Sequence, residues 1–337
     1  MTRVALFRRP FLTDGRPEFI SKTLRASNYS VTETADDAIN PSDADVVWIQ
    51  DNINWFPTLR RQLFQMPKVR RPFVVVWLTE PLRLPSAAGY PPVSLNAREI
   101  AKIVLRDARA TDPYTNYQRL KQAAERGVPD LLVVSSRSRQ TFLAEKGIES
   151  EFVPLGYYEG LGRDMQVSRD IDVLFLGTLD DPRHRTSVEY LRSNGVAIHA
   201  LGDWHDPKYW DDARTLLINR TRIFLNIQRN AGELSGHRMI LGMANMAMVL
   251  SEPIFDPFPY EPGRHYLSAS LPQMADTIDL YLADDKARNE IAAAGHEFVT
   301  TRLTMDQSVS RIVSMIEERS QKGERMNQFA AHSRQSM

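Results

Sequence analysis

The sequence predicts an α/β protein with two Rossmann-like domains, each built on a parallel sheet. Two series of short apolar runs alternate with amphipathic segments, the first over residues 4–153 and the second over residues 172–250. Short apolar runs are typical of strands buried on both faces of a parallel sheet, and the amphipathic segments of the helices that cover it. At 337 residues the chain is long enough for two domains of ordinary size.

In the first half, apolar runs bounded by polar or turn residues predict the strands. They cover residues 4–7, 45–50, 73–78 and 131–134. Helical spacing of apolar residues predicts helices around residues 19–24, over 56–66, over 96–110, and through Leu143 after a cap at Ser135 or Ser136. Residues 82–92 are rich in proline and predict an irregular loop near the mouth of the sheet.

The second half repeats the alternation after a glycine-containing segment at residues 154–168, where we expect the domain boundary. Strands are predicted at residues 172–176, 196–201, 223–227 and 247–250. Helices are predicted at residues 185–193, 209–217, 271–282, 286–298 and 305–318, and one more after residue 235. The expected domains are therefore residues 1–155 and 168–318, followed by a flexible tail at 319–337.

Residues 223–252 contain the most informative pattern, a strand, a polar loop, a helix and a second strand. In parallel sheets such a loop lies at the carboxyl end of a strand, beside a helix N-terminus that attracts anions. The loop provides a carboxylate, a hydroxyl, a glycine and two cationic side chains, which suit a diphosphate that carries a sugar: Glu233, Ser235, Gly236, His237 and Arg238. A simpler interpretation makes Ser235 a helix cap and leaves His237 and Arg238 solvated.

Charge is unevenly distributed although the formal net charge is zero. Residues 1–150 carry 22 Lys and Arg against 16 Asp and Glu, whereas the remainder carries 20 against 26. This asymmetry predicts an acidic partner for the first half, with a solvated basic face as the alternative. The chain has no cysteine, no apolar run long enough for a transmembrane helix and no signal-peptide pattern, so we expect a cytoplasmic protein.

Residues 130–315 resemble the GT-B glycosyltransferases, specifically the bacterial family-4-like and spore-maturation-type (CgeB-like) group. The resemblance rests on VVSSRSRQTFLAEKG, VPLGYY, DVLFLGTLDDPRHRTSVEYL, the stretch 223–252, and PGRHYLSASLPQMADTIDLYLADDKARNEIAAAGHEFVTTRLT. It implies two Rossmann-like domains that face a cleft, with the C-terminal helix crossing back to the first domain. It also implies a nucleotide sugar as the donor substrate, with no cofactor and no metal.

The family has a Glu-x7-Glu motif that spans the donor site. Glu233 matches the first glutamate, which faces the donor sugar, and Gly236 matches the family's glycine three residues later. The second glutamate, which holds the nucleotide ribose, is replaced by Leu241, so Glu252 is the nearest carboxylate that could take over this role. A small glycine of the family is replaced by Met246.

The resemblance also assigns phosphate contacts to the turn after the first strand of the second domain. The backbone of Gly177 and Thr178 would approach the phosphates there, and Arg183 or Arg185 would supply positive charge. A plain tight turn is the alternative, because one Gly-Thr pair is a weak motif.

An inverting transferase needs a base that takes the acceptor proton, and the first domain could supply it. All seven histidines lie beyond residue 180, so a base from the first domain would be a carboxylate. Asp51 and Glu80 are the candidates, because each follows a predicted strand at its carboxyl end. A retaining mechanism, the commoner one in family 4, requires neither.

Three functions fit the sequence. The first is an active, metal-independent and retaining glycosyltransferase. The second is a binding or scaffolding protein that kept the fold and lost turnover, which the leucine at position 241 favours. The third is a glycosyltransferase with a polyanionic acceptor such as nucleic acid or a phosphate-rich glycan, which the basic first half favours. The donor nucleotide, the sugar and the acceptor do not follow from the sequence.

Overall fold

The protein folds around two separate parallel sheets. The computed structural model describes residues 1–8, 15–35, 40–90, 95, 97–105, 112–202 and 211–335. The first sheet has the order β2-β1-β3-β4-β5-β6 with every pair parallel. Its strands are β1 (Arg3–Phe7), β2 (Ser30–Thr34), β3 (Val46–Gln50), β4 (Phe73–Leu78), β5 (Leu131–Val134) and β6 (Glu151–Phe152).

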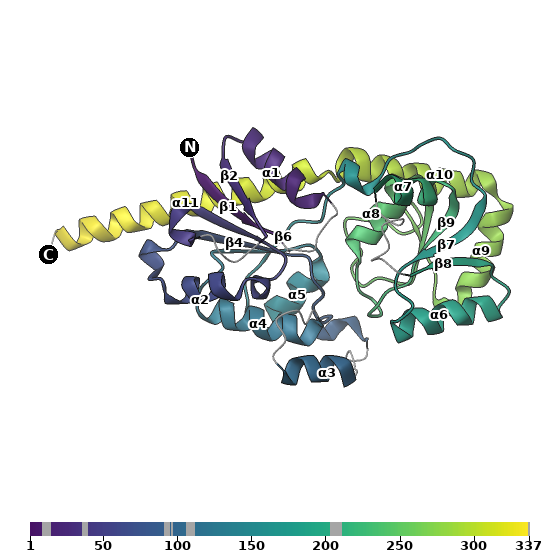
Figure 1. The fold of residues 1–337 in the computed structure, drawn as a ribbon, viewed down its shortest axis with the longest axis horizontal. Helices are drawn as coiled ribbons and strands as arrows, with labels where there is room; N and C mark the ends of the chain where they lie inside the picture. The colour runs from purple at the N-terminus through teal and green to yellow at the C-terminus, as the bar shows by residue number, and fades with distance from the viewer. Residues whose placement is uncertain are drawn as a thin grey trace.

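Helices cover both faces of the first sheet (Figure 1), as the doubly wound pattern requires. The helices of this part of the chain are α1 (Arg16–Ala26), α2 (Pro57–Gln65), α3 (Ala97–Val104), α4 (Pro113–Glu125) and α5 (Arg137–Glu145), of which α3 lies away from the sheet. Short 3-10 turns lie at Pro41–Asp43, Ile53–Trp55, Lys68–Arg70, Ser86–Ala88 and Glu159–Leu161. Trp48 and Trp77 are fully buried on one face of this sheet, and Val47 and Ile49 on the other, which explains why the strands read as continuous apolar runs.

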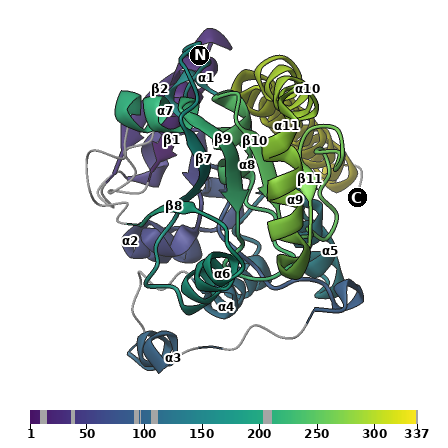
Figure 2. The same cartoon turned by 90° about the vertical axis from the view of Figure 1, so that its right-hand side faces the viewer.

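The second sheet has the order β11-β10-β9-β7-β8 and is also parallel throughout (Figure 2). Its strands are β7 (Ile171–Leu176), β8 (Ile198–Leu201), β9 (Thr221–Asn226), β10 (Met248–Ser251) and β11 (Leu267–Ser268). Its helices are α6 (Pro182–Ser193), α7 (Asp211–Asn219), α8 (Gly236–Ala244), α9 (Leu271–Ala283) and α10 (Asp285–Glu297), the last continued by a π-helical turn at Phe298–Arg302.

The chain passes between the two sheets twice, and the two passages are hydrogen-bonded to each other. The Tyr157 amide donates to the carbonyl of Leu303 at 2.7 Å, and the Met305 amide donates to the carbonyl of Tyr157 at 2.7 Å. Gly156 is needed here, because a Cβ atom at this position would lie 2.3 Å from the backbone of Thr304. The segment that joins the domains is therefore a short double-stranded connection.

Helix α11 (Met305–Gln335) leaves this connection and runs back along the first sheet (Figure 1). Its apolar residues belong to the same buried cluster as Ile20 and Leu24 of α1. The Arg319 guanidinium binds the Asp130 carbonyl at 2.9 Å and the Glu151 carboxylate at 2.9 Å. The crossing of the C-terminal helix to the first domain is therefore confirmed.

The sequence prediction of two Rossmann-like sheets is confirmed, but several elements differ. Strands β2, β6 and β11 and helix α4 were not predicted, and α11 continues to Gln335 through the segment expected to be a flexible tail. Strand β2, at the sheet edge, has the sequence SVTET with one apolar residue, and β6 and β11 have two residues each, so none of the three gives an apolar run. Parts of the predicted loop at 82–92, and of the predicted helices at 96–110 and 209–217, lie outside the described residues. No helix within the described ranges is long and apolar enough to cross a membrane.

We predict that Ile312→Ala in α11 destabilises the protein by about 2–5 kcal/mol, because it removes a fully buried side chain from the cluster shared with the first sheet. Urea unfolding at neutral pH measures the change. The matched control is Leu280→Ala in α9, whose side chain is exposed and whose loss should change the free energy of unfolding by about 0.5 kcal/mol or less. Equal effects of the two substitutions would contradict the packing of α11 on the first domain.

Candidate functional site

The loops that follow β7 and β9 lie at the point where the strand order of the second sheet reverses. Because β8 and β9 flank β7, the connection after β7 goes to one side of the sheet and the connection after β9 to the other. Ligands of parallel sheets bind at the carboxyl ends of the strands at this kind of switch point. The residues singled out in the second half of the sequence, namely Gly177 to Arg185 and Glu233 to Arg238, lie in these loops or the first turns of α6 and α8.

Glu233 forms an ion pair that links the second domain to the first. Its carboxylate accepts hydrogen bonds from Arg139 Nη2 of α5 at 3.1 Å and from Asn230 Nδ2 at 2.8 Å. The Arg139 side chain is 7% exposed and the Glu233 side chain 14% exposed, so this ion pair is largely shielded from water. Ser136 caps α5, as was predicted for Ser135 or Ser136, and Ser135 Oγ accepts a second bond from Arg139 at 2.6 Å.

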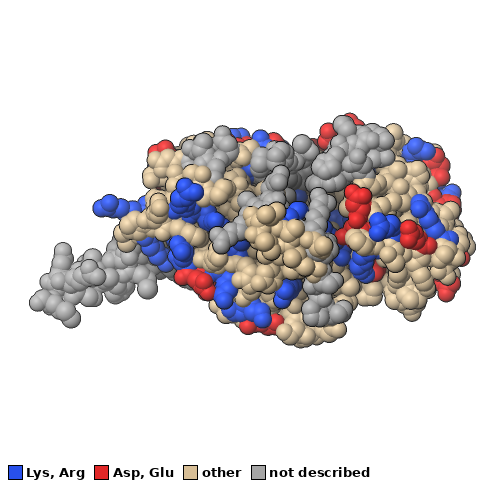
Figure 3. Space-filling model, turned by 60° about the horizontal axis from the view of Figure 1, so that its bottom comes forward, with Lys and Arg blue, Asp and Glu red and all other residues tan. Residues whose placement is uncertain are grey.

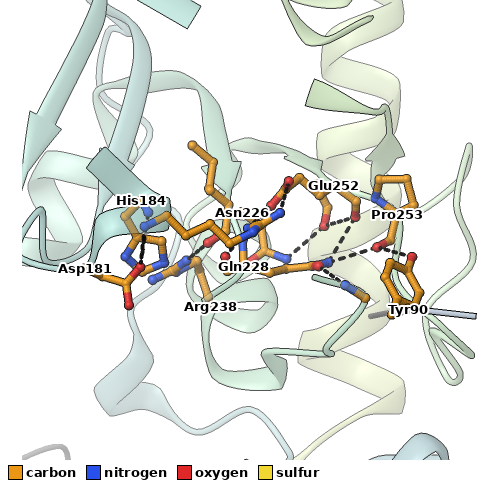
Figure 4. Close-up of polar contacts among 12 residues, drawn as sticks. Tyr90, Asp181, His184, Asn226, Gln228, Arg238, Glu252 and Pro253 are labelled. Atoms are coloured by element: carbon orange, nitrogen blue, oxygen red, sulfur yellow. Dashed lines mark hydrogen bonds and ion pairs between the residues drawn. The ribbon is translucent and has the colours of Figure 1, made fainter. Parts of the chain in front are cut away.

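Glu252 forms a two-pronged ion pair with Arg183, and Figure 4 shows Glu252 beside Gln228. Arg183 lies in the first turn of α6, and Glu252 directly follows β10. The distance from Arg183 Nη1 to Glu252 Oε2 is 2.8 Å, and the same oxygen accepts the backbone amide of Gln228 at 2.9 Å. The Gln228 side chain in turn bonds to the carbonyl of Glu252 at 3.2 Å. These bonds fix the Arg183 guanidinium at the mouth of the second sheet.

Arg238 places a positive charge against the turn after β7. Its guanidinium donates to the carbonyl of Ile227 and lies 5.4 Å from the centre of the Phe175 ring. Burial lowers the pKa of Arg238 to about 10, which leaves the side chain protonated at neutral pH. A Cβ atom on Gly177 would lie 2.9 Å from Arg238 Nη2, so the glycine allows the backbone to approach the cation closely.

His184 and Asp181 hold the turn between β7 and α6. Asp181 Oδ1 caps α6 by accepting the amides of Arg183 at 3.0 Å and His184 at 3.2 Å. The Nδ1 of His184 bonds to the carbonyl of Thr178 at 3.0 Å. Burial lowers the pKa of His184 to about 4, so the ring is neutral at pH 7 and Nδ1 carries the proton that the carbonyl accepts. Arg185 lies exposed in the same helix.

The N-terminus of α8 has no side-chain cap. Ser235 occupies the cap position, but its side chain makes no hydrogen bond to the helix amides. Helix α8 begins at Gly236, and Ser235, Gly236 and His237 are all partly exposed. The amide groups of this first turn, together with the helix dipole, make the end of α8 attractive to an anion.

The two positions that differ from the glycosyltransferase motif are structural here. Leu241 is buried in the apolar cluster beneath α8. Met246 follows the end of α8 with a φ of 57°, in the left-handed region that favours glycine.

A cavity of about 780 Å³ lies between the two domains, and several of these residues line it. The second domain contributes Asp181, Arg183, Arg229, Asn230 and Glu233 to its wall. Of the two arginines left open by the sequence, Arg183 lines the cavity, and Arg185 is not among its described lining residues. The charged residues that the first domain contributes include Arg83, Glu99, Lys121 and Lys146.

Neither proposed base of the first domain is among the described residues that line this cavity. Asp51 is almost fully buried after β3 and accepts a hydrogen bond from the Thr79 hydroxyl. Thr79 also accepts a bond from Arg16 at 3.4 Å, and Glu80 follows Thr79 in the chain. On the face seen in Figure 3, Lys and Arg side chains are spread over the first domain.

Sequence reasoning missed the first-domain residues that contact the loop after β9. Arg139 lies 94 positions before its partner Glu233, so no local spacing connects them. Tyr90 packs against Gly232, where a Cβ atom would lie 2.4 Å from the ring, and its hydroxyl reaches the Pro253 carbonyl at 3.4 Å. Arg229 bonds to Asp181 at 3.1 Å and lies 3.8 Å from Glu99 of the first domain.

Residues 183–314 match the protein family described as Glycosyl transferase-like. This region begins at Arg183 and includes Glu233, all of α8 and Glu252, so it contains most of the polar residues described above. No match was found among curated protein sequences.

Solved structures with the same architecture include the Anabaena protein HepE (Alr3699) in complex with UDP and glucose. That structure is 10% identical to the chain, covers 94% of this chain and 100% of its own, and has a TM-score of 0.63. Sucrose-phosphate synthase from Thermosynechococcus elongatus is 12% identical, with coverage of 94% and 99% and a TM-score of 0.63. AviGT4, a glycosyltransferase involved in avilamycin A biosynthesis, is 11% identical, with coverage of 94% and 97% and a TM-score of 0.55. The two parallel sheets of this chain and the cavity between them thus form the GT-B fold of glycosyltransferases.

Proposed function

We propose that this protein transfers a sugar from a nucleotide-diphosphate sugar to an acceptor. The observation that carries the proposal is the position of Glu233 and Arg183, which both line the cavity at the switch point of the second sheet. Both also lie in the region that matches the Glycosyl transferase-like family. The Anabaena protein has been solved with UDP and with UDP-glucose, so UDP and UDP-glucose are the first ligands to test.

The roles follow from the charges of the site. The leaving diphosphate would be stabilised by the amides at the N-terminus of α8, where Ser235, Gly236 and His237 lie, and by Arg183 and Arg238. The backbone of Gly177 and Thr178 would approach the phosphates from the other side of the switch point. Glu233 would accept hydrogen bonds from hydroxyl groups of the donor sugar. Because helix amides and arginines supply the positive charge, we propose that transfer needs no metal.

We assign Glu252 a role that depends on Arg183. The leucine at position 241 cannot accept ribose hydroxyls, and Glu252, the carboxylate expected from the sequence to take over this role, has much of its acceptor capacity occupied by Arg183 and the Gln228 amide. We therefore propose that Glu252 mainly orients the Arg183 guanidinium towards the phosphates. The alternative, that Glu252 holds the ribose, stays a prediction of the sequence.

We propose a retaining mechanism, which needs no base from the first domain. This choice over an inverting mechanism is supported by the burial of Asp51, and by the position of Asp51 and Glu80 outside the described lining of the cavity. Membership of the spore-maturation-type (CgeB-like) group and a cytoplasmic location stay predictions. The acceptor is proposed to be acidic, because Arg83, Lys121 and Lys146 belong to the first-domain wall of the cavity.

A binding protein without turnover is the second candidate function. It is favoured by the leucine at position 241, and by the pairing of Glu233 and Arg183 with protein groups. A thermal-shift screen of nucleoside diphosphates and nucleotide sugars tests both candidates. A ligand at 100 times its Kd stabilises the folded state by about 2.7 kcal/mol, which raises the Tm. The absence of any shift in the whole panel would contradict both functions.

We predict that Glu233→Gln lowers transfer by roughly ten- to a hundredfold and leaves the affinity for UDP nearly unchanged. The substitution weakens a charge-assisted hydrogen bond to the sugar, which contributes about 1.5–3 kcal/mol, and touches no group assigned to the nucleotide. Release of UDP from UDP-glucose measures transfer to water, and calorimetric titration measures binding. Glu99→Gln is the control, because Glu99 lines the same cavity from the first domain. Equal rates for wild type and Glu233→Gln would remove Glu233 from the sugar site.

A second prediction compares neighbouring arginines. Arg183→Gln should weaken UDP binding and lower transfer by roughly tenfold or more, because it removes a cation assigned to the diphosphate. Arg185→Gln changes the same charge two residues later on an exposed surface and should leave both quantities within about twofold. If both variants behave alike, Arg183 does not contact the phosphates.

A further inference from the structure

Tyr260 is held rigidly in the loop between β10 and β11. Its side chain is 3% exposed and belongs to the same buried cluster as the apolar residues of α8. The ring packs edge-on against Phe298, with 5.8 Å between ring centres. The backbone amide donates to the carbonyl of Pro257 at 3.0 Å, which closes the turn. The direction of the phenol is therefore fixed by packing on the ring and by the turn.

The hydroxyl group of Tyr260 is buried and has no hydrogen-bond partner among the residues that the structure describes. Leaving a buried hydroxyl without a partner costs about 1–3 kcal/mol, so most buried hydroxyls in native proteins are satisfied. Phenylalanine would fill the same space without this cost. Burial also raises the pKa of Tyr260, so the hydroxyl keeps its proton and remains a hydrogen-bond donor at neutral pH.

The hydroxyl points at the start of α8. A Cβ atom placed on Gly236, the first residue of this nine-residue helix, would lie 4.0 Å from Tyr260 Oη and 3.8 Å from Leu155 Cβ. Each Cα–Cβ bond of a helix is tilted towards its N-terminus, so this space lies at the N-terminal end of α8. The residue at the cap position, Ser235, makes no side-chain bond to the helix amides.

We propose that Tyr260 is a further ligand of the donor, and that its hydroxyl donates a hydrogen bond to a phosphate oxygen of the diphosphate bound at the N-terminus of α8. The inference rests on the proposed function and adds a neutral donor to the helix amides and arginines of the site. An oxyanion at this position would satisfy the buried hydroxyl and would lie in the favourable field of the helix dipole. Gly236 places no side chain between the hydroxyl and the first turn of the helix.

Two substitutions separate this role from a structural one. Tyr260→Phe removes only the hydroxyl, so the free protein should be as stable as wild type or more stable, while the Kd for UDP rises about tenfold or more. Gly236→Ala should also be tolerated, because its Cβ atom would make ordinary contacts and alanine is the better helix former. The added methyl group nevertheless fills the space in front of the hydroxyl, so UDP should again bind more weakly. Calorimetric titration of UDP and urea unfolding without ligand provide the two measurements.

Tyr157→Phe is the matched control, because the Tyr157 hydroxyl donates to the Gly162 carbonyl at 2.9 Å. This variant should lose some stability and bind UDP as wild type does. If wild type binds UDP and Tyr260→Phe binds it equally well, the inference is wrong and the proposed function stands. A loss of stability in Tyr260→Phe with unchanged binding would mean that the hydroxyl bonds within the protein or to a trapped water, which also overturns it. If wild type binds none of UDP, GDP, ADP and dTDP, the proposed function itself fails.

Discussion

The parallel order of the second sheet is the constraint on which the candidate site depends. The carboxyl ends of all its strands lie on the same side of the domain. The strand order reverses between β7 and β9, so the loop after β7 and the loop after β9 lead to opposite sides of the sheet. The space between them is bounded by the N-terminal ends of α6 and α8, where the helix dipoles are positive, and the first turn of α8 has no side-chain cap. Arg183 and Glu233 reach the interdomain cavity because their loops begin at this edge.

Three carboxylates in this region are each paired with an arginine. Glu233 is paired with Arg139, Glu252 with Arg183 and Asp181 with Arg229. Removing one partner of a shielded pair leaves an uncompensated charge, so these pairs keep the site ordered before a ligand arrives. A diphosphate would bring its own negative charge and compete with the carboxylates for the same guanidinium groups. The pair of Arg139 with Glu233 links this region to the first domain.

The sequence predicted the parts of the structure that depend on local patterns. Apolar runs predicted most strands of both sheets, and the resemblance to GT-B enzymes predicted the crossing of α11. Edge strand β2 was missed because alternate residues face solvent, and α4 because its apolar face is narrow. The ion pair of Arg139 with Glu233 depends on tertiary structure alone, as does the orientation of Tyr260 towards Gly236, so neither could follow from spacing. The roles of the predicted site residues stay predictions until a ligand is bound.

A crystal structure of the protein with UDP would test the central claim most directly, because it locates the phosphates independently of any assay. The account predicts both phosphates at the N-terminus of α8, with oxygens within about 3 Å of backbone amides and of the Arg183 guanidinium. Density for UDP in any other part of the molecule, with the start of α8 and Arg183 free of phosphate, would contradict it.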